Sequence, residues 1–386
     1  MTARGKITTL IVLQIFLLFF QGFMIAPLLP RFAAVFATTV DRASILVPAY
    51  TLPYGVICLV IGPLADRHGR ARVMRWLIAL GVVLPILTTT ATSLPMLVGW
   101  RIVTGLALGG IAPIALAMIA TMYPYEERGR PVGWVFGAIA GGMALGATCG
   151  PWLEPTLGWR GLFALVSALD LLVAIPLWRA VGHAPVVAAP PRVALAKAYV
   201  ALVSTRRGAT LYAFIFLNGA FHSGVFSWLG VYFTERYHLA PRELGLALLG
   251  YGIPGFLLGP VVGKLADRFG RRGLIRTGLT IASLCALALV LPLPVVGATA
   301  TITVLSFGFD LSHPLFAGMV TALDPVRTAQ AMALNTFAIF VGFGTGSILF
   351  GLARTALGMS GALIAFACFQ MLLAAASLAL FDRTWR

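Results

Sequence analysis

Uninterrupted apolar segments of about 20 residues recur along the whole chain, and they constrain its fold more than any other feature. Residues 7–20 and 361–380, for example, contain no charged residue. A helix of about 20 apolar residues spans the roughly 30 Å hydrocarbon core of a bilayer, where the backbone must satisfy its own hydrogen bonds. Neither segment alternates apolar and polar residues as the strands of a transmembrane barrel do. The sequence therefore predicts an all-α membrane protein.

The composition agrees with that prediction and excludes several classes of function. Of the 386 residues, 60% are hydrophobic and only 10% are charged, and the mean hydropathy is +0.95. The net charge of +16 does not indicate a nucleic-acid partner, because basic residues beside a membrane set topology and contact anionic lipid. The four cysteines lie within apolar segments without metal-ligand spacing. We therefore expect no nucleic acid and no cofactor.

Polar residues divide the chain into twelve predicted spans. One long polar interruption, 180–208, contains three prolines and is expected to be a cytoplasmic linker. It separates two predicted six-helix bundles, 1–179 and 209–386. The spans are placed near 7–29, 43–64, 73–92, 95–122, 131–153, 159–179, 209–233, 243–263, 273–291, 296–320, 330–353 and 358–381.

The distribution of basic residues predicts the orientation. If both termini and the linker share one side, 21 of the 28 lysines and arginines lie on that side and six lie opposite. The positive-inside rule makes the first side cytoplasmic. We expect a multi-pass protein of the inner (plasma) membrane with both termini in the cytoplasm.

A nine-residue loop occurs twice. The first copy reads Gly62-Pro-Leu-Ala-Asp66-Arg67-His-Gly69-Arg70, and the second reads Gly263-Lys-Leu-Ala-Asp267-Arg268-Phe-Gly270-Arg271, with seven of nine positions identical at an offset of 201 residues. The loop resembles the signature of the major facilitator superfamily, G-x-L-a-D-r-x-G-r-[RK]. The resemblance implies twelve helices in two pseudo-symmetric six-helix bundles, with the substrate site between them.

That resemblance also assigns the loop a role as a charge latch that stabilises one conformation. From the residues themselves, Gly62 is expected to allow close helix approach and Gly69 a tight turn. A weaker echo, Glu127-Arg128, recurs after the tenth span at Asp324-Pro-Val-Arg327. The predicted latch comprises Gly62, Asp66, Arg67, Gly69, Arg70, Asp267, Arg268 and Arg128.

The fifth span carries glycines at helical spacing. They form a flat face against which another helix can pack closely, and a proline adds a bend. The pattern resembles the antiporter motif of the drug:proton exporters in this superfamily, although Glu154 and Pro155 stand where the family usually has two glycines. The motif residues are Gly137, Gly142, Gly146, Gly150 and Pro151.

Polar residues at membrane depth usually face a protein interior, because lipid exposure is costly. In this superfamily helices 1, 4, 7 and 10 line the cavity, and Arg101 matches an R-x-x-x-G motif of the fourth helix. Two alternatives remain, namely that Asn218 and the glutamines only tie helices together and that Arg101 reaches the outer surface. The predicted substrate cavity comprises Gln14, Gln21, Arg101, Asn218, His222, Trp228, Phe307 and Asp310.

Proton coupling is assigned to Asp310, with His313 and His222 as partners. Histidine changes charge near neutral pH, and Asp310 lies near the middle of its span. The first span contains no acid, so another group must take this role. A structural Asp310–His313 pair is the alternative, and Asp170 is the next candidate. Two imidazoles and a carboxylate also suit a divalent transition metal, although no metal site is predicted.

The sequence thus predicts a secondary active transporter, a monomer that exports small amphipathic organic compounds in exchange for protons by alternating access. Its partners are the small-molecule substrate, protons and the lipid bilayer. The alternatives are a proton-coupled importer of sugars or organic acids, a divalent metal exporter, and a ligand sensor that does not transport. No nucleophile–base pair or phosphate-binding loop supports an enzyme.

Overall fold

The computed structural model describes residues 3–124, 127–181, 195–252, 265–266, 268–324 and 327–380, which form helices and their connections without a strand. The amino-terminal half contains α1 (Ala3–Phe23), η1 (Ala26–Leu28), α2 (Leu29–Val35), α3 (Val40–Ala43), η2 (Ser44–Leu46), α4 (Pro48–His68), α5 (Arg70–Thr88), α6 (Leu94–Leu108), α7 (Ile111–Met122) and α8 (Gly129–Val181). After α9 (Leu195–Val203), the carboxy-terminal half contains α10 (Arg206–Tyr237), α11 (Pro241–Leu249), η4 (Gly250–Gly252), α13 (Arg271–Ala288), α14 (Val295–Leu323) and α15 (Thr328–Leu380).

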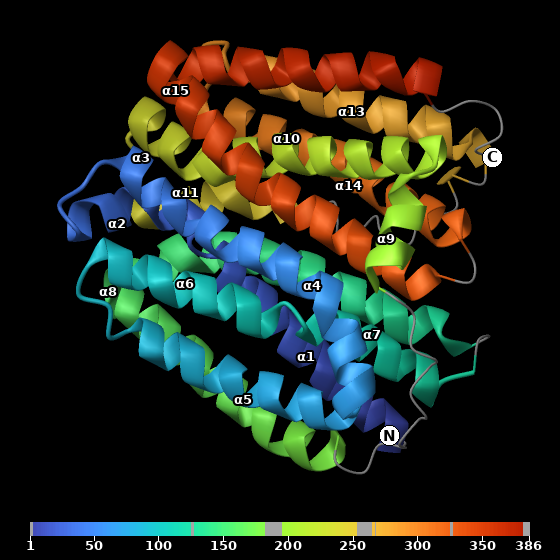
Figure 1. The fold of residues 1–386 in the computed structure, drawn as a ribbon. Helices are drawn as coiled ribbons and strands as arrows, with labels where there is room; N and C mark the ends of the chain where they lie inside the picture. The colour runs from blue at the N-terminus through green and yellow to red at the C-terminus, as the bar shows by residue number, and fades with distance from the viewer. Residues whose placement is uncertain are drawn as a thin grey trace.

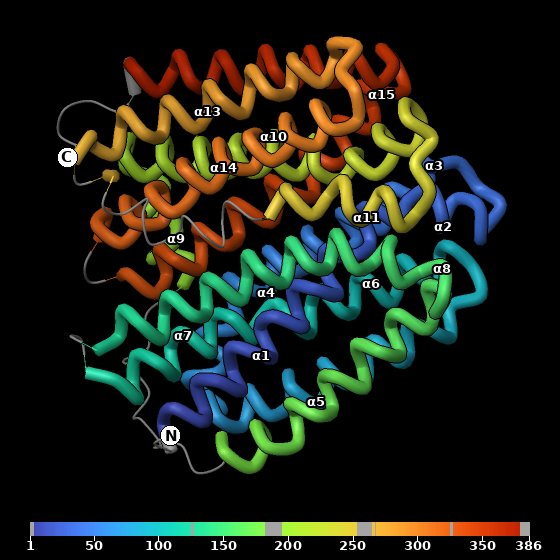
Figure 2. The backbone as a smooth tube through the Cα atoms, turned by 180° about the vertical axis from the view of Figure 1, so that it is seen from behind, coloured from blue at the N-terminus to red at the C-terminus, as the bar shows by residue number. Residues whose placement is uncertain are grey.

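The two halves form two helical bundles that lie side by side. In Figure 1 the blue-to-green half lies below the yellow-to-red half, and the same two layers are seen from behind in Figure 2. Both chain termini and α9 lie at one end of the helices (Figure 1). The opposite end is called the outer end below. The predicted all-α fold with two bundles is confirmed.

The two longest helices each contain two membrane spans. α8 and α15 have 53 residues each, and about 80 Å of continuous helix would be far longer than a bilayer is thick. Each is interrupted by a glycine with positive φ, Gly158 (φ 65°) and Gly358 (φ 74°), a conformation that favours glycine. These turns coincide with the predicted boundaries at 153–159 and 353–358, and they lie 200 residues apart.

The predicted number of twelve spans is consistent with the structure. Eight helices within the described part of the chain are long and apolar enough to cross a membrane, and α8 and α15 each account for two spans. α13 coincides with the predicted ninth span. Residues 253–264, within the predicted eighth span, lie outside the described residues.

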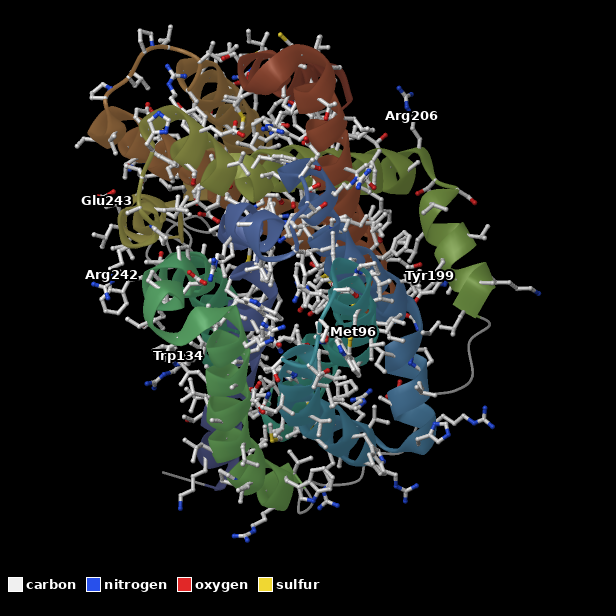
Figure 3. All side chains as sticks on the ribbon, turned by 90° about the vertical axis from the view of Figure 1, so that its left-hand side faces the viewer. Met96, Trp134, Tyr199, Arg206, Arg242 and Glu243 are labelled. Carbon is white, nitrogen blue, oxygen red and sulfur yellow. The ribbon has the colours of Figure 1, made fainter. Side chains whose placement is uncertain are left out.

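The short helix α9 lies in the region expected to link the halves. It is hydrogen-bonded to α4 at a backbone carbonyl that a proline leaves free. The hydroxyl group of Tyr199 donates a hydrogen bond of 2.6 Å to the carbonyl oxygen of Leu59 in α4. Pro63, four residues further along α4, lacks the N–H that would otherwise occupy this carbonyl. Figure 3 shows Tyr199 on α9 beside the amino-terminal half. Residues 182–194 of the predicted linker lie outside the described residues.

Candidate functional site

Two of the three residues predicted to couple protons, His222 and His313, are brought together around one aromatic ring. The imidazole of His222 on α10 stacks on Phe309 of α14 with ring centroids 3.7 Å apart. His313, one turn further along α14, stacks on the same ring at 5.3 Å. His222 is buried, whereas His313 and Asp310 are half-buried. The two histidines thus meet at one α10–α14 contact, and Asp310 follows Phe309 in the sequence of α14.

Hydrogen bonds add two further residues to this cluster. Ser306 donates to a carboxylate oxygen of Asp310 over 3.1 Å, one turn along the same helix. The hydroxyl group of Tyr251 in η4 forms a 3.1 Å hydrogen bond with Nδ1 of His222. We call Tyr251, His222, Asp310 and His313 the coupling cluster.

Sequence reasoning missed Tyr251, although the internal repeat contained a signal for it. At the same offset of 201 residues that relates the two signature loops, Tyr50-x-x-Pro53 recurs as Tyr251-x-x-Pro254. Applying the offset to the whole span, rather than to the loop alone, would have marked both tyrosines as repeat-related positions.

Two of the predicted cavity residues form hydrogen bonds within a bundle. The amide nitrogen of Gln14 on α1 donates 2.9 Å to Asp170 on α8, and both side chains are buried. Asn218 on α10 donates 3.2 Å to Ser312 and accepts 2.9 Å from Gln370. These bonds tie helices together, which is the alternative left open for these residues. Their place in a substrate cavity stays a prediction.

Arg101 is buried within the amino-terminal bundle and points to protein atoms. Its guanidinium donates to the carbonyl oxygens of Gly22 (3.0 Å) and Leu46 (3.4 Å), and it lies 4.3 Å from the ring centre of Tyr50. An arginine inside a membrane protein requires such partners. Its contacts are therefore consistent with an inward-facing residue and differ from those of a side chain that reaches the outer surface.

Among the described residues, the other predicted cavity residues form no hydrogen bond with the coupling cluster. Gln21 on α1 is buried, and its two amide atoms have no hydrogen-bond partner among the described residues. Trp228 is buried on α10, and its indole N–H donates 3.1 Å to Ser347. Phe307 on α14 is half-buried.

The predicted antiporter glycines pack against the first helix of the same bundle. A Cβ at Gly142 would lie 2.5 Å from the carbonyl oxygen of Phe16, and one at Gly146 would lie 2.4 Å from that of Phe20. A Cβ at Gly150 would approach Met24 at 3.1 Å. A Cβ at Gly137 would meet no atom within 4 Å, so the close packing expected of the stripe begins at Gly142.

The first signature loop is held by an ion pair within the loop itself. Nε of Arg70 lies 2.7 Å from the carboxylate of Asp66, and Gly69 between them has φ 91°. Gly270, the equivalent glycine of the second signature loop, has φ 78°, while Asp267 lies outside the described residues. The close helix approach expected at Gly62 is not found, because a Cβ there would meet no atom within 4 Å.

The other predicted latch residues lie nearby along the chain. Arg128 donates 2.9 Å to the carbonyl oxygen of Tyr123, and Arg268 lies over the ring of Phe269 at 5.3 Å. Arg67 is exposed. The structure shows no single arrangement that joins all of them, and the latch stays a prediction.

Replacing Asp66 by asparagine is expected to slow transport about tenfold while changing substrate affinity by less than about tenfold, or about 1.4 kcal/mol. The substitution removes the Asp66–Arg70 ion pair, and this loop lies at the end of α4 outside the coupling cluster. Transport rates and ligand binding of the purified variant separate the two effects. Loss of binding by a folded Asp66→Asn protein would place this residue in the site instead.

At the outer end the two halves are in close contact. The ring of Phe23 lies 5.9 Å from that of Phe226 and 6.3 Å from that of Phe343 in the other half. A Cβ at Gly230 would lie 2.7 Å from the Cα of Pro27. A small cavity of about 10 Å³, roughly one water molecule, lies between the halves here and is lined by Gly22, Phe23, Ala26, Val47, Thr51, Ser223, Phe226 and Ser227.

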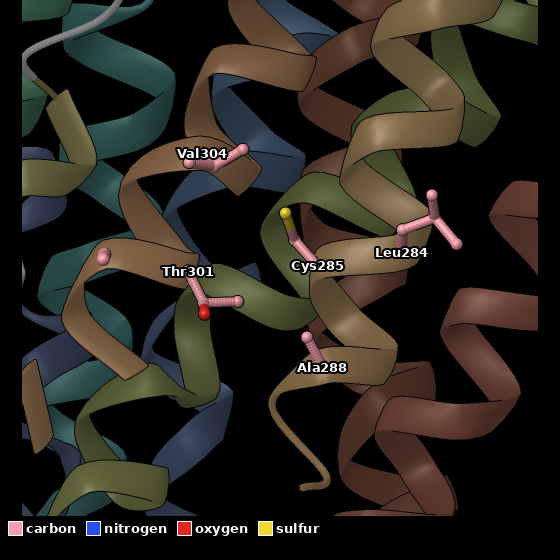
Figure 4. Close-up of a pocket in the computed structure, with 6 residues that line it drawn as sticks. Leu284, Cys285, Ala288, Thr301 and Val304 are labelled. Carbon is pink, nitrogen blue, oxygen red and sulfur yellow. The ribbon is translucent and has the colours of Figure 1, made fainter. Parts of the chain in front are cut away.

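A larger cavity of about 350 Å³ lies between α13 and α14 and is lined mainly by apolar side chains (Figure 4). Leu284, Cys285 and Thr301 are among its lining residues, and no charged side chain lines it. It contains no member of the coupling cluster. Within the described part of the chain, no three His, Cys, Asp or Glu side chains are grouped closely enough to hold a metal ion, so the metal-exporter alternative gains no support from the structure.

Two repeated helical bundles that meet around buried polar and aromatic residues define a membrane transporter. The family model of the Major Facilitator Superfamily matches residues 11–347 and 237–384. The chain belongs to this superfamily, as its signature loops predicted.

Known proteins similar to this chain are also transporters or resistance proteins. The Uncharacterized MFS-type transporter YceJ of Bacillus subtilis (strain 168) is 25% identical over 358 residues, covering 91% of this chain and 90% of that protein. The Chloramphenicol resistance protein of Streptomyces lividans is 28% identical over 346 residues, covering 87% and 85%. The inward-facing, occupied structure of a bacterial homolog to the human lysosomal transporter Spinster matches with TM-score 0.82 over 99% of this chain and 97% of that chain. At 17% identity this last likeness shows the fold alone.

Proposed function

We propose that the protein exports small amphipathic organic compounds in exchange for protons. The observation that carries the proposal is the coupling cluster, in which two histidines stack on Phe309 and Asp310 is the next residue of α14. A carboxylate beside histidines can bind and release a proton during a transport cycle. The glycine stripe on α8, which resembles an antiporter motif, and the similarity to a chloramphenicol resistance protein support the direction of transport.

The side chains around the cluster favour an amphipathic substrate over an organic anion. Phe226 and Phe343 lie beside His222 and give the site apolar surface, and Asp310 supplies negative charge. The guanidinium of Arg101 already contacts two backbone carbonyls and the Tyr50 ring, so it is poorly placed to bind the carboxylate of a substrate. Small-molecule sites usually combine such apolar surface with a few polar groups.

The proposed transporter works as a monomer of 40.9 kDa in the plasma membrane, with bundles 1–179 and 209–386 rocking about the site and both termini cytoplasmic. The 21-to-6 distribution of basic residues and the common end of the two termini in Figure 1 support this orientation. In intact cells an impermeant thiol reagent should label a cysteine at Ser93 and leave one at Lys197 unlabelled. Labelling at Lys197 would reverse the orientation.

Transport by the purified protein in liposomes tests the function. A pH gradient should drive accumulation of radiolabelled chloramphenicol, whereas glucose and citrate should not accumulate. Accumulation of glucose or citrate would favour the importer alternative. Binding of these compounds without counterflow of any of them would favour a ligand sensor.

A further inference from the structure

Tyr251 lies where the coupling cluster meets the contact between the two halves. Its hydroxyl group is hydrogen-bonded to His222 at 3.1 Å, and its buried ring lies 4.9 Å from that of Phe226. The His222 imidazole that binds Tyr251 stacks in turn on Phe309, the residue before Asp310 in α14. One side chain therefore touches α10 at the point where α10 meets α14.

The backbone next to Tyr251 packs against the other bundle without any spare room. A Cβ at Gly252 would lie 1.9 Å from the Cβ of Ala144 on α8, and a Cβ at Gly245 would lie 2.5 Å from the carbonyl oxygen of Thr148. Ala144 and Thr148 alternate along α8 with the glycines that pack on α1, so α8 contacts both halves. A shift of η4 relative to α8 must therefore displace Tyr251 as well.

The same arrangement occurs at the repeat-related position of the amino-terminal half. Tyr50 lies against Arg101, as Tyr251 is hydrogen-bonded to His222 of the coupling cluster, and Arg101 and Asp310 lie on the fourth predicted span of their own half. The residues after Tyr50 also contact the other half, because a Cβ at Gly344 would lie 2.5 Å from Leu52. Gly344 and Ala144 lie 200 residues apart, as Tyr251 and Tyr50 lie 201 apart. Each half thus joins a buried charge to the interface through one tyrosine.

We propose that Tyr251 is a positioning residue that links the protonation of the Asp310–His222 cluster to the α8–α11 contact between the halves. The inference rests on the proposed proton coupling. A change of charge at the cluster alters the hydrogen bond that holds Tyr251, and Tyr251 moves with the segment that contacts α8. By linkage, a conformation that changes proton affinity is itself shifted by proton binding.

The link is sensitive to pH in the carboxy-terminal half alone. Among the described residues, the titratable groups of the cluster that binds Tyr251 are His222 on α10 and Asp310 and His313 on α14, while α8 presents Ala144 and Thr148 at this contact. In the amino-terminal half the corresponding charge belongs to Arg101, and arginine keeps its charge throughout the physiological range. The two tyrosines therefore differ in function although they occupy equivalent positions.

Tyr251→Phe tests the proposal, because it removes the hydroxyl group and keeps the buried ring. Spin labels at Ser93 and Leu291, on exposed outer loops of the two halves, report the distance between the halves as the pH is varied in a background without native cysteines. The wild-type distance should change between about pH 6 and pH 8, and Tyr251→Phe should reduce that change about tenfold.

Three variants separate this link from a general loss of stability. Tyr232→Phe removes a buried hydroxyl group that donates to the carbonyl oxygen of Leu289, and Tyr50→Phe alters the repeat-related position. Neither should change the pH dependence of the distance. Gly252→Ala keeps the Tyr251 side chain but forces η4, and Tyr251 with it, away from Ala144, so it should weaken the same pH response.

The outcomes distinguish this inference from the proposed function. A wild-type distance that is insensitive to pH, or a Tyr251→Phe response equal to wild type, overturns the role of Tyr251. Absence of pH-driven chloramphenicol accumulation by the wild type instead overturns the proposed function for that compound. The spin-label distance is measured without substrate, so the role of Tyr251 is tested independently of chloramphenicol transport.

Discussion

Asp310→Asn is expected to exchange chloramphenicol across a liposome membrane at nearly the wild-type rate and to lose accumulation driven by a pH gradient. A gradient of about two pH units can support about 100-fold accumulation by a one-for-one exchanger, since each unit is worth about 1.4 kcal/mol. Asparagine keeps the size of the side chain and a hydrogen bond with Ser306, but it cannot bind and release the proton. The accumulation ratio should therefore fall from about 100 to about 1.

Asp170→Asn is the matched control for this experiment, because it also removes a carboxylate from the membrane region. Asp170 accepts one hydrogen bond from Gln14 inside the amino-terminal bundle, away from the contact between the halves. An amide can retain that bond, so this variant should accumulate the compound like wild type. If accumulation survives Asp310→Asn and is lost in Asp170→Asn, the coupling role belongs to Asp170. Equal loss of exchange and accumulation in Asp310→Asn would favour the structural Asp310–His313 pair.

The fold could be predicted because lipid leaves few choices to a backbone. Apolar segments of sufficient length must be helices, and the repeated signature loop fixes the pairing of six helices with six. The turns at Gly158 and Gly358 fall between predicted spans, and each has the positive φ that glycine adopts readily. The convergence of His222 and Asp310 depended on the family arrangement of α10 and α14.

The partners of single polar residues could not be predicted in the same way. Helical periodicity places Gln14 and Gln21 on one face of α1, but it does not show which neighbour that face meets. In the structure Gln14 meets Asp170, while neither amide atom of Gln21 has a hydrogen-bond partner among the described residues. Tyr251 was missed for a related reason, because its importance depends on a contact with α10 and not on its own span.

Arg354→Ala is expected to open the outer end of the interface. The guanidinium of Arg354 lies 2.7 Å from Asp41 of the amino-terminal half and 2.5 Å from Glu235 of its own half, so it fastens the two bundles together. Its side chain is only 16% exposed, whereas the two carboxylates are 42% and 46% exposed. Pairs of this kind contribute up to about 1 kcal/mol each. Only the Asp41 pair crosses between the halves, so its loss should favour the open state by up to about fivefold.

Reactivity of a cysteine at position 227 measures this opening. Ser227 is fully buried and lines the narrow space between the halves, so an impermeant thiol reagent should reach Ser227→Cys only when the outer end opens. In a background whose four native cysteines are replaced by serine, Arg354→Ala should raise the labelling rate up to about fivefold. Arg236→Ala is the matched control, because Arg236 lies at the same end but donates only to backbone carbonyls of its own half.

Salt provides an independent test of the same ion pairs. At about 1 M salt the screening length falls to about 3 Å, so labelling of the otherwise wild-type protein should rise towards that of Arg354→Ala. Labelling of the variant itself should respond little, because the charge that fastens the halves is already absent. The prediction is wrong if Ser227→Cys is labelled at the same rate in the presence of Arg354, in Arg354→Ala and at high salt. In that case the Phe23–Phe226 and Pro27–Gly230 contacts keep the outer end closed, and the ion pairs do not contribute to closure.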